Sequence, residues 1–209
     1  MLSEIENHSL TETVDVNNGI QYESMDEIID DAKMLGCDTI VNCTGLGASL
    51  LCNDNNLIGA RGILHHYDRK TAQRTTDIGK ANENDAVITI EDEPWGSETM
   101  PCYLIPRGDV LVVGGSYLEG DQLLEFRDEE EAKLKLNALN VGIDTNVSDP
   151  IDKWTGFRPY RPEVRLEVDH TYETKESIKI VHNYGHGGSG WTVFIGAARA
   201  AASLVVDKA

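Results

Sequence analysis

The sequence is short of positive charge. Its 18 lysine and arginine residues stand against 36 aspartate and glutamate residues, which gives a formal net charge of −18. Because the basic residues are also scattered, a phosphate backbone would be repelled, and we expect no nucleic acid partner. No apolar window approaches the length that spans a bilayer, and the N-terminus lacks a basic and a hydrophobic segment. We therefore expect no membrane partner and no export.

Cysteine is scarce too, and its pattern argues against disulfides and structural metal. No Cys-x-x-Cys pair occurs and no histidine stands at ligand spacing from the four cysteines, Cys37, Cys43, Cys52 and Cys102. The adjacent His65 and His66 would face opposite sides of a strand, and a glycine loop interrupts His182 and His186. We expect free thiols and no metal site.

The stretch most rich in features is residues 182–192, which read His-Asn-Tyr-Gly-His-Gly-Gly-Ser-Gly-Trp-Thr. An alternating strand is expected before it at 177–181, and a buried, small-residue helix after it at 192–206. Glycines let a ligand approach the backbone, and free N–H groups at a helix start carry partial positive charge. The loop therefore suits an electron-rich ligand, although a tight turn that closes a domain would have the same composition.

The N-terminal part predicts one strand–helix–strand unit. Residues 1–12 are polar and are expected to be flexible, and residues 14–22 form a weak strand. Ser24 and Glu27 make a capping box at the start of a helix that ends near Gly36. A strand at 39–42 follows and ends in a glycine turn, a position where α/β sheets bind ligands, although the residues alone favour a plain strand-to-helix connection.

The middle of the chain predicts strands and one surface helix. Strands are expected at 62–67 and 86–91, and a hairpin joins 102–105 to 110–114. Since no helix interrupts them, we expect an antiparallel sheet distinct from the first unit. Residues 128–140 predict a helix whose charges serve solvation only and whose buried stripe is Ala132, Leu136 and Leu139.

Four short motifs occur together, in a fixed order. They are Asn-Cys-Thr-Gly at 42–45, Tyr-Leu-Ile-Pro at 103–106, Gly-Phe-Arg-Pro at 156–159, and His-Asn-Tyr-Gly-His-Gly-Gly-x-Gly at 182–190. With this order and spacing the sequence resembles the D-amino-acid oxidase family of flavoenzymes, from about residue 24 to the C-terminus. The resemblance implies FAD as cofactor and a D-amino acid and oxygen as substrates. It also implies 2-oxo acid, ammonia and hydrogen peroxide as products, without a protein acid or base.

The resemblance assigns roles to individual residues. Arg158 would bind the substrate carboxylate, because Pro159 and Pro162 stiffen its backbone and guanidinium pairs with carboxylate through two parallel hydrogen bonds. A structural ion pair with one of the many acids is the alternative, and is what we expect of Arg161 and Arg165. The implied substrate-binding residues are Tyr103, Tyr117, Arg158 and Gly188. The implied cofactor-binding residues are Cys43, Thr44, Arg158, Gly187, Gly188, Gly190, Trp191 and Thr192.

One part of the family pattern is missing. Nothing in residues 1–22 supplies the strand and Gly-x-Gly-x-x-Gly turn that seat a dinucleotide pyrophosphate. We therefore expect an α+β fold, the C-terminal part of a two-domain flavoprotein with a partial Rossmann-like FAD-binding layer and an antiparallel substrate-domain sheet. The expected boundaries are 13–57 and 155–209 for the discontinuous FAD-binding part, and 58–154 for the substrate-binding part.

Several alternatives stay open at this point. The chain could be a non-catalytic truncated paralogue or a partner-binding remnant, or an oxidase of D-aspartate, glycine or an N-methyl amino acid. The loop at 95–100 stands where animal relatives carry a second active-site tyrosine, so substrate choice is open. We expect an intracellular protein, cytoplasmic by default and peroxisomal by family analogy, although the C-terminus lacks a Ser-Lys-Leu-like signal. A homodimer is a further expectation for a full-length form.

Overall fold

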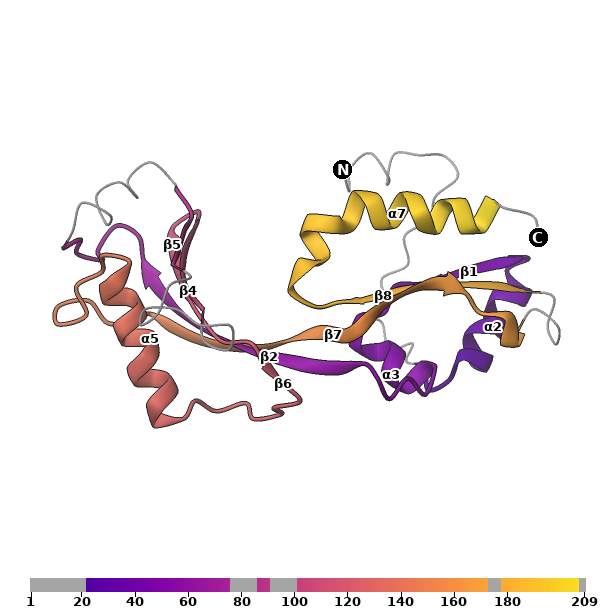
Figure 1. Cartoon of the computed structure of the whole chain (residues 1–209), viewed down its shortest axis with the longest axis horizontal. Helices are drawn as coiled ribbons and strands as arrows, with labels where there is room; N and C mark the ends of the chain where they lie inside the picture. Colours follow the sequence, from indigo (N-terminus) through magenta and orange to yellow (C-terminus); the bar gives the residue numbers. More distant parts are fainter. Residues whose placement is uncertain (1–21, 76–85, 91–100, 173–177, 207–209) are drawn as a thin grey trace.

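The computed structural model describes residues 22–75, 86–90, 101–172 and 178–206. Within them, eight strands form one mixed sheet with helices on its faces (Figure 1). In chain order the elements are α2 (Met25–Met34), β1 (Thr39–Asn42), η2 (Gly45–Gly47), α3 (Ala48–Leu51), β2 (Ile58–Asp68), β3 (Ile88–Ile90), β4 (Cys102–Arg107), β5 (Val110–Gly114), β6 (Leu118–Glu119), α5 (Asp128–Asn140), β7 (Asp152–Val168), β8 (Lys179–His186), η4 (Gly187–Ser189) and α7 (Gly190–Val206). The predicted α+β class is confirmed.

The sheet is continuous from one end of the molecule to the other. Its strand order is β1-β8-β7-β2-β5-β4-β3, with β6 beside β2, and β1 and β8 are parallel while the other pairs are antiparallel. Figure 1 shows two lobes joined by the long strands β2 and β7. We name the two lobes after the parts that the sequence predicts. The substrate lobe holds β3–β5 and α5, the flavin lobe holds β1, β8, α2, α3 and α7, and β6 lies between them beside Ala60 and Arg61 of β2. The expectation of a separate antiparallel sheet is wrong because β7 belongs to both lobes.

Two prolines do not break β7, for a local reason. Pro159 pairs with Gly59 of β2. On the other side, the β7–β8 register shifts between Tyr160 and Arg165, the segment that contains Pro162. A residue without an N–H group fits such an irregularity, because no ladder hydrogen bond is lost there.

Helix α2 forms as its capping box predicts. The Ser24 hydroxyl accepts a hydrogen bond from the Glu27 N–H, and the Glu27 carboxylate accepts one from the N–H of Glu23. The helix buries Met25 and Ile29 against the β1–β8 side of the sheet. The weak strand predicted at 14–22 lies almost wholly outside the described residues.

Helix α5 begins and ends where predicted, but it buries a different face. Its buried residues are Glu130, Leu134, Asn137 and Ala138. The three residues expected to be buried, Ala132, Leu136 and Leu139, are exposed. The helix is rotated because Arg61, fully buried on β2, binds the Glu130 carboxylate with two nitrogen atoms. Its charges therefore do more than solvate the surface.

Helix α7 is exposed, which contradicts the expectation of a buried helix. Of its seventeen residues only Ala201 is buried, and Trp191, at the N-terminal end, is 83% exposed. Residues 187–206 are also long and apolar enough to meet a length-and-composition criterion for a membrane span, so the statement that no window approaches that length is wrong. This criterion alone is weak, since core helices of soluble proteins meet it as well.

The substrate lobe has one covered and one open sheet face. Helix α5 packs on the covered face, where Ala138 joins Tyr67, Leu104 and Val113 in a hydrophobic cluster. Figure 1 shows the opposite face of β4 and β5 directed toward the flavin lobe. A site that uses both lobes would therefore form on this open face.

Candidate active site

Arg158 lies near the middle of β7, where the two lobes meet. Its residue pair on β2 is Ala60, so its side chain stands on the open face. The Nη1 atom donates a hydrogen bond to the Ser116 carbonyl oxygen at 3.0 Å, and the guanidinium carbon lies 5.4 Å from the centre of the Tyr117 ring. These contacts hold the guanidinium in place on one side.

Three glycines form a flat floor on this face. A Cβ atom at Gly62 would overlap the Arg158 guanidinium, one at Gly114 would overlap the Tyr103 ring, and one at Gly156 would overlap the Trp154 ring. Register explains the grouping, since Gly62 pairs with Gly156 across β2 and β7, and Gly114 pairs with Tyr103 across β5 and β4. We call Gly62, Gly114 and Gly156 the glycine floor. It lets large side chains lie flat on the sheet.

Tyr103 complements Arg158 on the floor. Burial raises the pKa of the Tyr103 hydroxyl, and the nearby Arg158 guanidinium only partly opposes this rise. The phenol therefore keeps its proton at neutral pH and can donate a hydrogen bond. Two donors, a guanidinium and a neutral hydroxyl, thus lie side by side on this face.

The glycine loop of η4 meets this pair from the flavin lobe. Gly187 has a φ of +55°, and a Cβ there would approach the Tyr117 hydroxyl to 2.7 Å. A Cβ at Gly188 would lie 3.5 Å from Cδ of Arg158 and 3.7 Å from the Tyr117 ring. The structure therefore brings together the four residues proposed to bind substrate, Tyr103, Tyr117, Arg158 and Gly188. Their roles stay a prediction.

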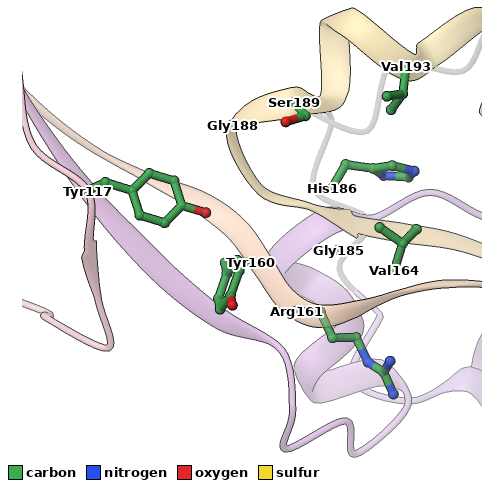
Figure 2. A pocket seen from close by; sticks show the side chains of 9 residues that line it. All are labelled: Tyr117, Tyr160, Arg161, Val164, Gly185, His186, Gly188, Ser189 and Val193. Atoms are coloured by element: carbon green, nitrogen blue, oxygen red, sulfur yellow. The ribbon is translucent and has the colours of Figure 1, made fainter. Parts of the chain in front are cut away.

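A cavity of about 390 Å³ lies beside the loop. Tyr117, Tyr160 and Gly188 line one part of it, and His186, Val164 and Val193 line another. Figure 2 shows the Tyr117 hydroxyl directed toward the loop, with Tyr160 between Tyr117 and the Arg161 side chain. Tyr160, which the sequence did not single out, packs edge-on against Tyr117 with ring centres 6.0 Å apart.

The proposed cofactor residues fall into two groups. Arg158, Gly187 and Gly188 border the site just described, and Gly190, Trp191 and Thr192 form the first turn of α7. Cys43 and Thr44 follow the end of β1, and Asn42, the last residue of β1, pairs with His182 of β8. Strand β8 runs on for four more residues before the glycine loop, so Cys43 and Thr44 are separated from that loop. Cys43 lines a second cavity of about 360 Å³ with Asn183, Ala198 and Val206.

The loop residues fit an electron-rich aromatic ring system such as a flavin. Gly185, Gly187 and Gly190 have the spacing Gly-x-Gly-x-x-Gly between a strand and a helix, which lets a ligand approach backbone N–H groups at a helix start. A Cβ at Gly190 would meet only His186 within 4 Å, so this side of the loop is open.

A buried polar network underlies the flavin lobe, and the sequence did not reveal it. His182 lies 3.0 Å from Asp169 through Nε2 and 3.2 Å from the Asn42 amide through Nδ1. Burial lowers the pKa of His182, so the neutral ring donates to Asp169 and accepts from Asn42. Burial alone would raise the pKa of Asp169, but hydrogen bonds from His182 and Thr171 lower it to about 2.

The same network uses a residue that the sequence placed in an acidic linker. Asp54 is buried and accepts hydrogen bonds from Arg161 at 3.0 Å and from the Tyr184 hydroxyl at 2.8 Å. Arg165 donates to the same Tyr184 hydroxyl at 2.9 Å. Arg161 and Arg165 are thus structural, as expected. The Asp169 carboxylate, thirteen residues before His182, orients the His182 ring.

The fold is that of amino acid oxidases with known structure. Glycine oxidase from Bacillus cereus ATCC 14579 superposes with a TM-score of 0.56, covers 81% of this chain and 43% of its own, and is 15% identical. Glycine oxidase from Geobacillus kaustophilus gives a TM-score of 0.55 at 16% identity, over 81% of this chain and 41% of its own. These similarities show the fold, an α+β fold that the chain shares with these proteins.

The sequence comparisons define the family. The family model described as FAD dependent oxidoreductase (DAO) matches residues 5–204, and the chain belongs to this family, whose cofactor is FAD. D-amino acid oxidase from Dugesia ryukyuensis is 32% identical over 85% of this chain and 48% of its own length. D-amino-acid oxidase from Dictyostelium discoideum is 31% identical over 88% and 50%. Human D-aspartate oxidase is 27% identical over 81% and 44%. The chain spans about half the length of these relatives.

Proposed function

We propose that the chain supplies two parts of an FAD-dependent oxidase of D-amino acids. One is the substrate clamp, formed by Arg158 and Tyr103, and the other is the flavin-ring loop at residues 187–192. The observation that carries the proposal is the convergence of Arg158, Tyr103 and Tyr117 over the glycine floor and against Gly188. FAD would supply the redox chemistry of this reaction, which is hydride acceptance from the substrate α-carbon followed by reoxidation with oxygen. The products are an imino acid, which hydrolyses to a 2-oxo acid and ammonia, and hydrogen peroxide.

The chain's own residues bind and orient the substrate. The Arg158 guanidinium pairs with the substrate carboxylate, and the protonated Tyr103 hydroxyl donates a further hydrogen bond to it. The Gly188 carbonyl accepts a hydrogen bond from the amino group, which places the α-carbon between the clamp and the loop. Gly187, Gly190 and the first turn of α7 would hold the ring.

The clamp can be tested in a molecule that also contains the part of the relatives' length that this chain does not span. A hybrid would place the N-terminal half of the Dugesia ryukyuensis relative before residue 24 of this chain. In this hybrid, Arg158→Lys should lower kcat/KM for D-alanine by roughly 30-fold, about 2 kcal/mol, because a lysine cannot form the paired hydrogen bonds. Flavin absorbance per protein should not change. Unchanged kcat/KM with bound flavin would refute the assignment.

A second candidate function is association with a partner without catalysis. Exposed apolar residues on the flavin lobe favour it, among them Val41 on β1 and Trp191, Ile195 and Val206 on α7. The hybrid distinguishes the two candidates. A folded hybrid that neither retains FAD nor forms peroxide with D-alanine, D-aspartate, glycine or an N-methyl amino acid would favour association.

A further inference from the structure

The open face of the substrate lobe carries one large side chain that the clamp does not use. Trp154 lies four residues before Arg158 on β7, so both side chains stand on the same face. Its ring lies over Gly156 of the glycine floor and is 49% exposed. This half-exposed indole on the open face is available to contact a ligand.

Register places this indole beside the carboxylate clamp. The ring covers Gly156, and the Arg158 guanidinium covers Gly62. Gly62 and Gly156 are direct partners in an antiparallel pair, whose Cβ positions lie about 5 Å apart. Indole and guanidinium are therefore neighbours on the floor. A ligand whose carboxylate is held by Arg158 has the indole next to it.

The surroundings of Trp154 are mainly apolar. Leu64 pairs with Trp154 on one side and with Gly114 on the other, and Gly114 in turn pairs with Tyr103. Trp154, Leu64 and the Tyr103 ring thus form one row across the face. In the next row Ile105 pairs with Val112. We call Trp154, Leu64 and Ile105 the apolar wall.

The wall disfavours a second carboxylate. The face of an indole ring is electron-rich and repels an anion, and desolvating a carboxylate against apolar groups is costly. Asp152 lies on the same side of β7, two residues before Trp154, and its partner His66 is 3.4 Å away. Arg107, a cation on this face, lies two rows from Tyr103 on β4. Its charge opposes the rise in the pKa of Tyr103, but its side chain is exposed to solvent.

We propose that Trp154 is a specificity-determining residue of this site, which forms the wall against the substrate side chain and selects apolar over acidic D-amino acids. This inference rests on the proposed function, since it takes Arg158 as the carboxylate anchor. It narrows the substrate class left open by relatives that are named as oxidases of D-amino acids and of D-aspartate.

The test uses the 209-residue chain labelled with 5-fluorotryptophan, and it needs neither flavin nor turnover. The chain has three tryptophans, and the ¹⁹F resonance that disappears in Trp154→Phe belongs to Trp154. Titration with D-leucine should shift this resonance saturably. D-Aspartate should bind with a dissociation constant about tenfold or more higher, the size of effect that one apolar contact against a charged group supports.

Two variants separate this inference from the proposed function. In Arg158→Gln, saturable binding of both ligands should be lost. In Trp154→Leu, the preference for D-leucine should fall at least about threefold, because a smaller, non-aromatic side chain covers less of the ligand. Isothermal titration calorimetry measures both affinities in the variants that lack the Trp154 resonance. Trp154→Phe should keep most of the preference, and Val147→Ala, on an exposed loop residue, should leave both affinities unchanged.

The possible contradictions are also distinct. If D-aspartate binds through Arg158 as tightly as D-leucine, or if the Trp154 resonance does not respond to D-leucine, the role of Trp154 is refuted and the clamp stands. If binding does not depend on Arg158, the proposed function fails first. Should Trp154→Leu not fold, the labelled wild-type chain and Trp154→Phe decide the matter alone.

Discussion

The two lobes of the molecule differ in how completely the chain covers its own apolar surface. In the substrate lobe, thirteen-residue α5 buries Leu134 and Ala138 completely and seals one face of the sheet. In the flavin lobe, seventeen-residue α7 buries only Ala201, although it is far more apolar. The helix with more acidic residues is thus the better buried one.

Long-range pairing explains this difference. Arg61 reaches α5 from β2, binds Glu130 there, and donates to the carbonyl oxygens of Leu123 and Glu125. Helix α7 is anchored at its C-terminal end, where the Lys179 ammonium of β8 donates hydrogen bonds to the Leu204 and Val205 carbonyl oxygens. Helix α5 is therefore well covered on its packed side, whereas the flavin lobe leaves an apolar helix face without cover among the described residues.

The largest expected effect concerns the flavin lobe. The 209-residue chain, purified alone, should not retain FAD or form peroxide with D-alanine. In the proposed function the loop before α7 holds only the ring end of FAD, and the pyrophosphate needs a second glycine turn at a helix start. The charge of −18 also opposes a diphosphate. Flavin absorbance after desalting and a peroxide assay check this. A chain that retains flavin and forms peroxide would show that the flavin lobe functions without further cover, which contradicts the difference between the lobes.

A second experiment removes the buried ion pair between Arg61 and Glu130 in the substrate lobe. Arg61→Met should lower the free energy of unfolding by about 3–5 kcal/mol, because it leaves the buried Glu130 carboxylate unpaired. Lys70→Met is the matched control, since Lys70 pairs with Asp109 at the surface, and its loss should cost less than about 0.5 kcal/mol. Urea unfolding measures both. Equal effects would show that the buried cluster does not stabilise this lobe.

A third experiment probes the polar network of the flavin lobe through pH. The pKa of Asp169 lies near 2 in the folded chain, below its ordinary value, so the ionised form stabilises the fold above about pH 4. This stability, about 2 kcal/mol, is lost as the pH falls from about 4 to 2. Asp169→Asn should remove that pH dependence.

His182 acts in the same direction over a higher pH range. Since burial lowers its pKa, the unfolded chain binds the proton more readily, and stability falls as the pH drops below about 6.5. Urea unfolding from pH 7 to 5 should show a smaller loss in His182→Gln than in the wild type. Parallel curves would contradict the neutral state of this histidine.

The smallest effect on stability is expected at the exposed face of α7. Ile195→Glu should change the free energy of unfolding by less than about 0.5 kcal/mol, because Ile195 is 54% exposed. The same change should reduce self-association of the chain, measured by sedimentation velocity, since it interrupts an apolar surface. Ser203→Glu, on the same helix but not at an apolar position, serves as the control. If both variants self-associate equally, the surface through which the chain associates does not include Ile195.

Local signals gave a good account of local structure. The cap at Ser24 and the acidic first turn at Asp128 set the starts of α2 and α5, because both act within one helical turn. The hairpin of β4 and β5 also formed as expected, with its turn at Gly108 and Asp109. These features depend on neighbours in sequence.

What the sequence did not show depends on distant partners. The rotation of α5 follows from Arg61, 69 residues before Glu130, and the burial of Asp54 follows from Tyr184, 130 residues after it. Family motifs did gather Tyr103, Arg158 and Gly188, but Trp154 and Tyr160 became visible only through strand register. The loop at 95–100 lies outside the described residues, and the domain boundaries stay predictions.

Strand β7 sets the spacing of the site. It carries Arg158 and Trp154 on one continuous backbone, and two positions after Arg158 its Tyr160 pairs with His186 at the edge of the glycine loop. The β7 backbone and its hydrogen bonds to β8 therefore fix the distance between Arg158 and the glycine loop, so we expect packing between the lobes to have little influence on this distance. Opening of the site for substrate entry should then occur by loop displacement and not by rotation of one lobe against the other. Single-molecule distance measurements across the lobes should accordingly show one narrow population, with or without ligand.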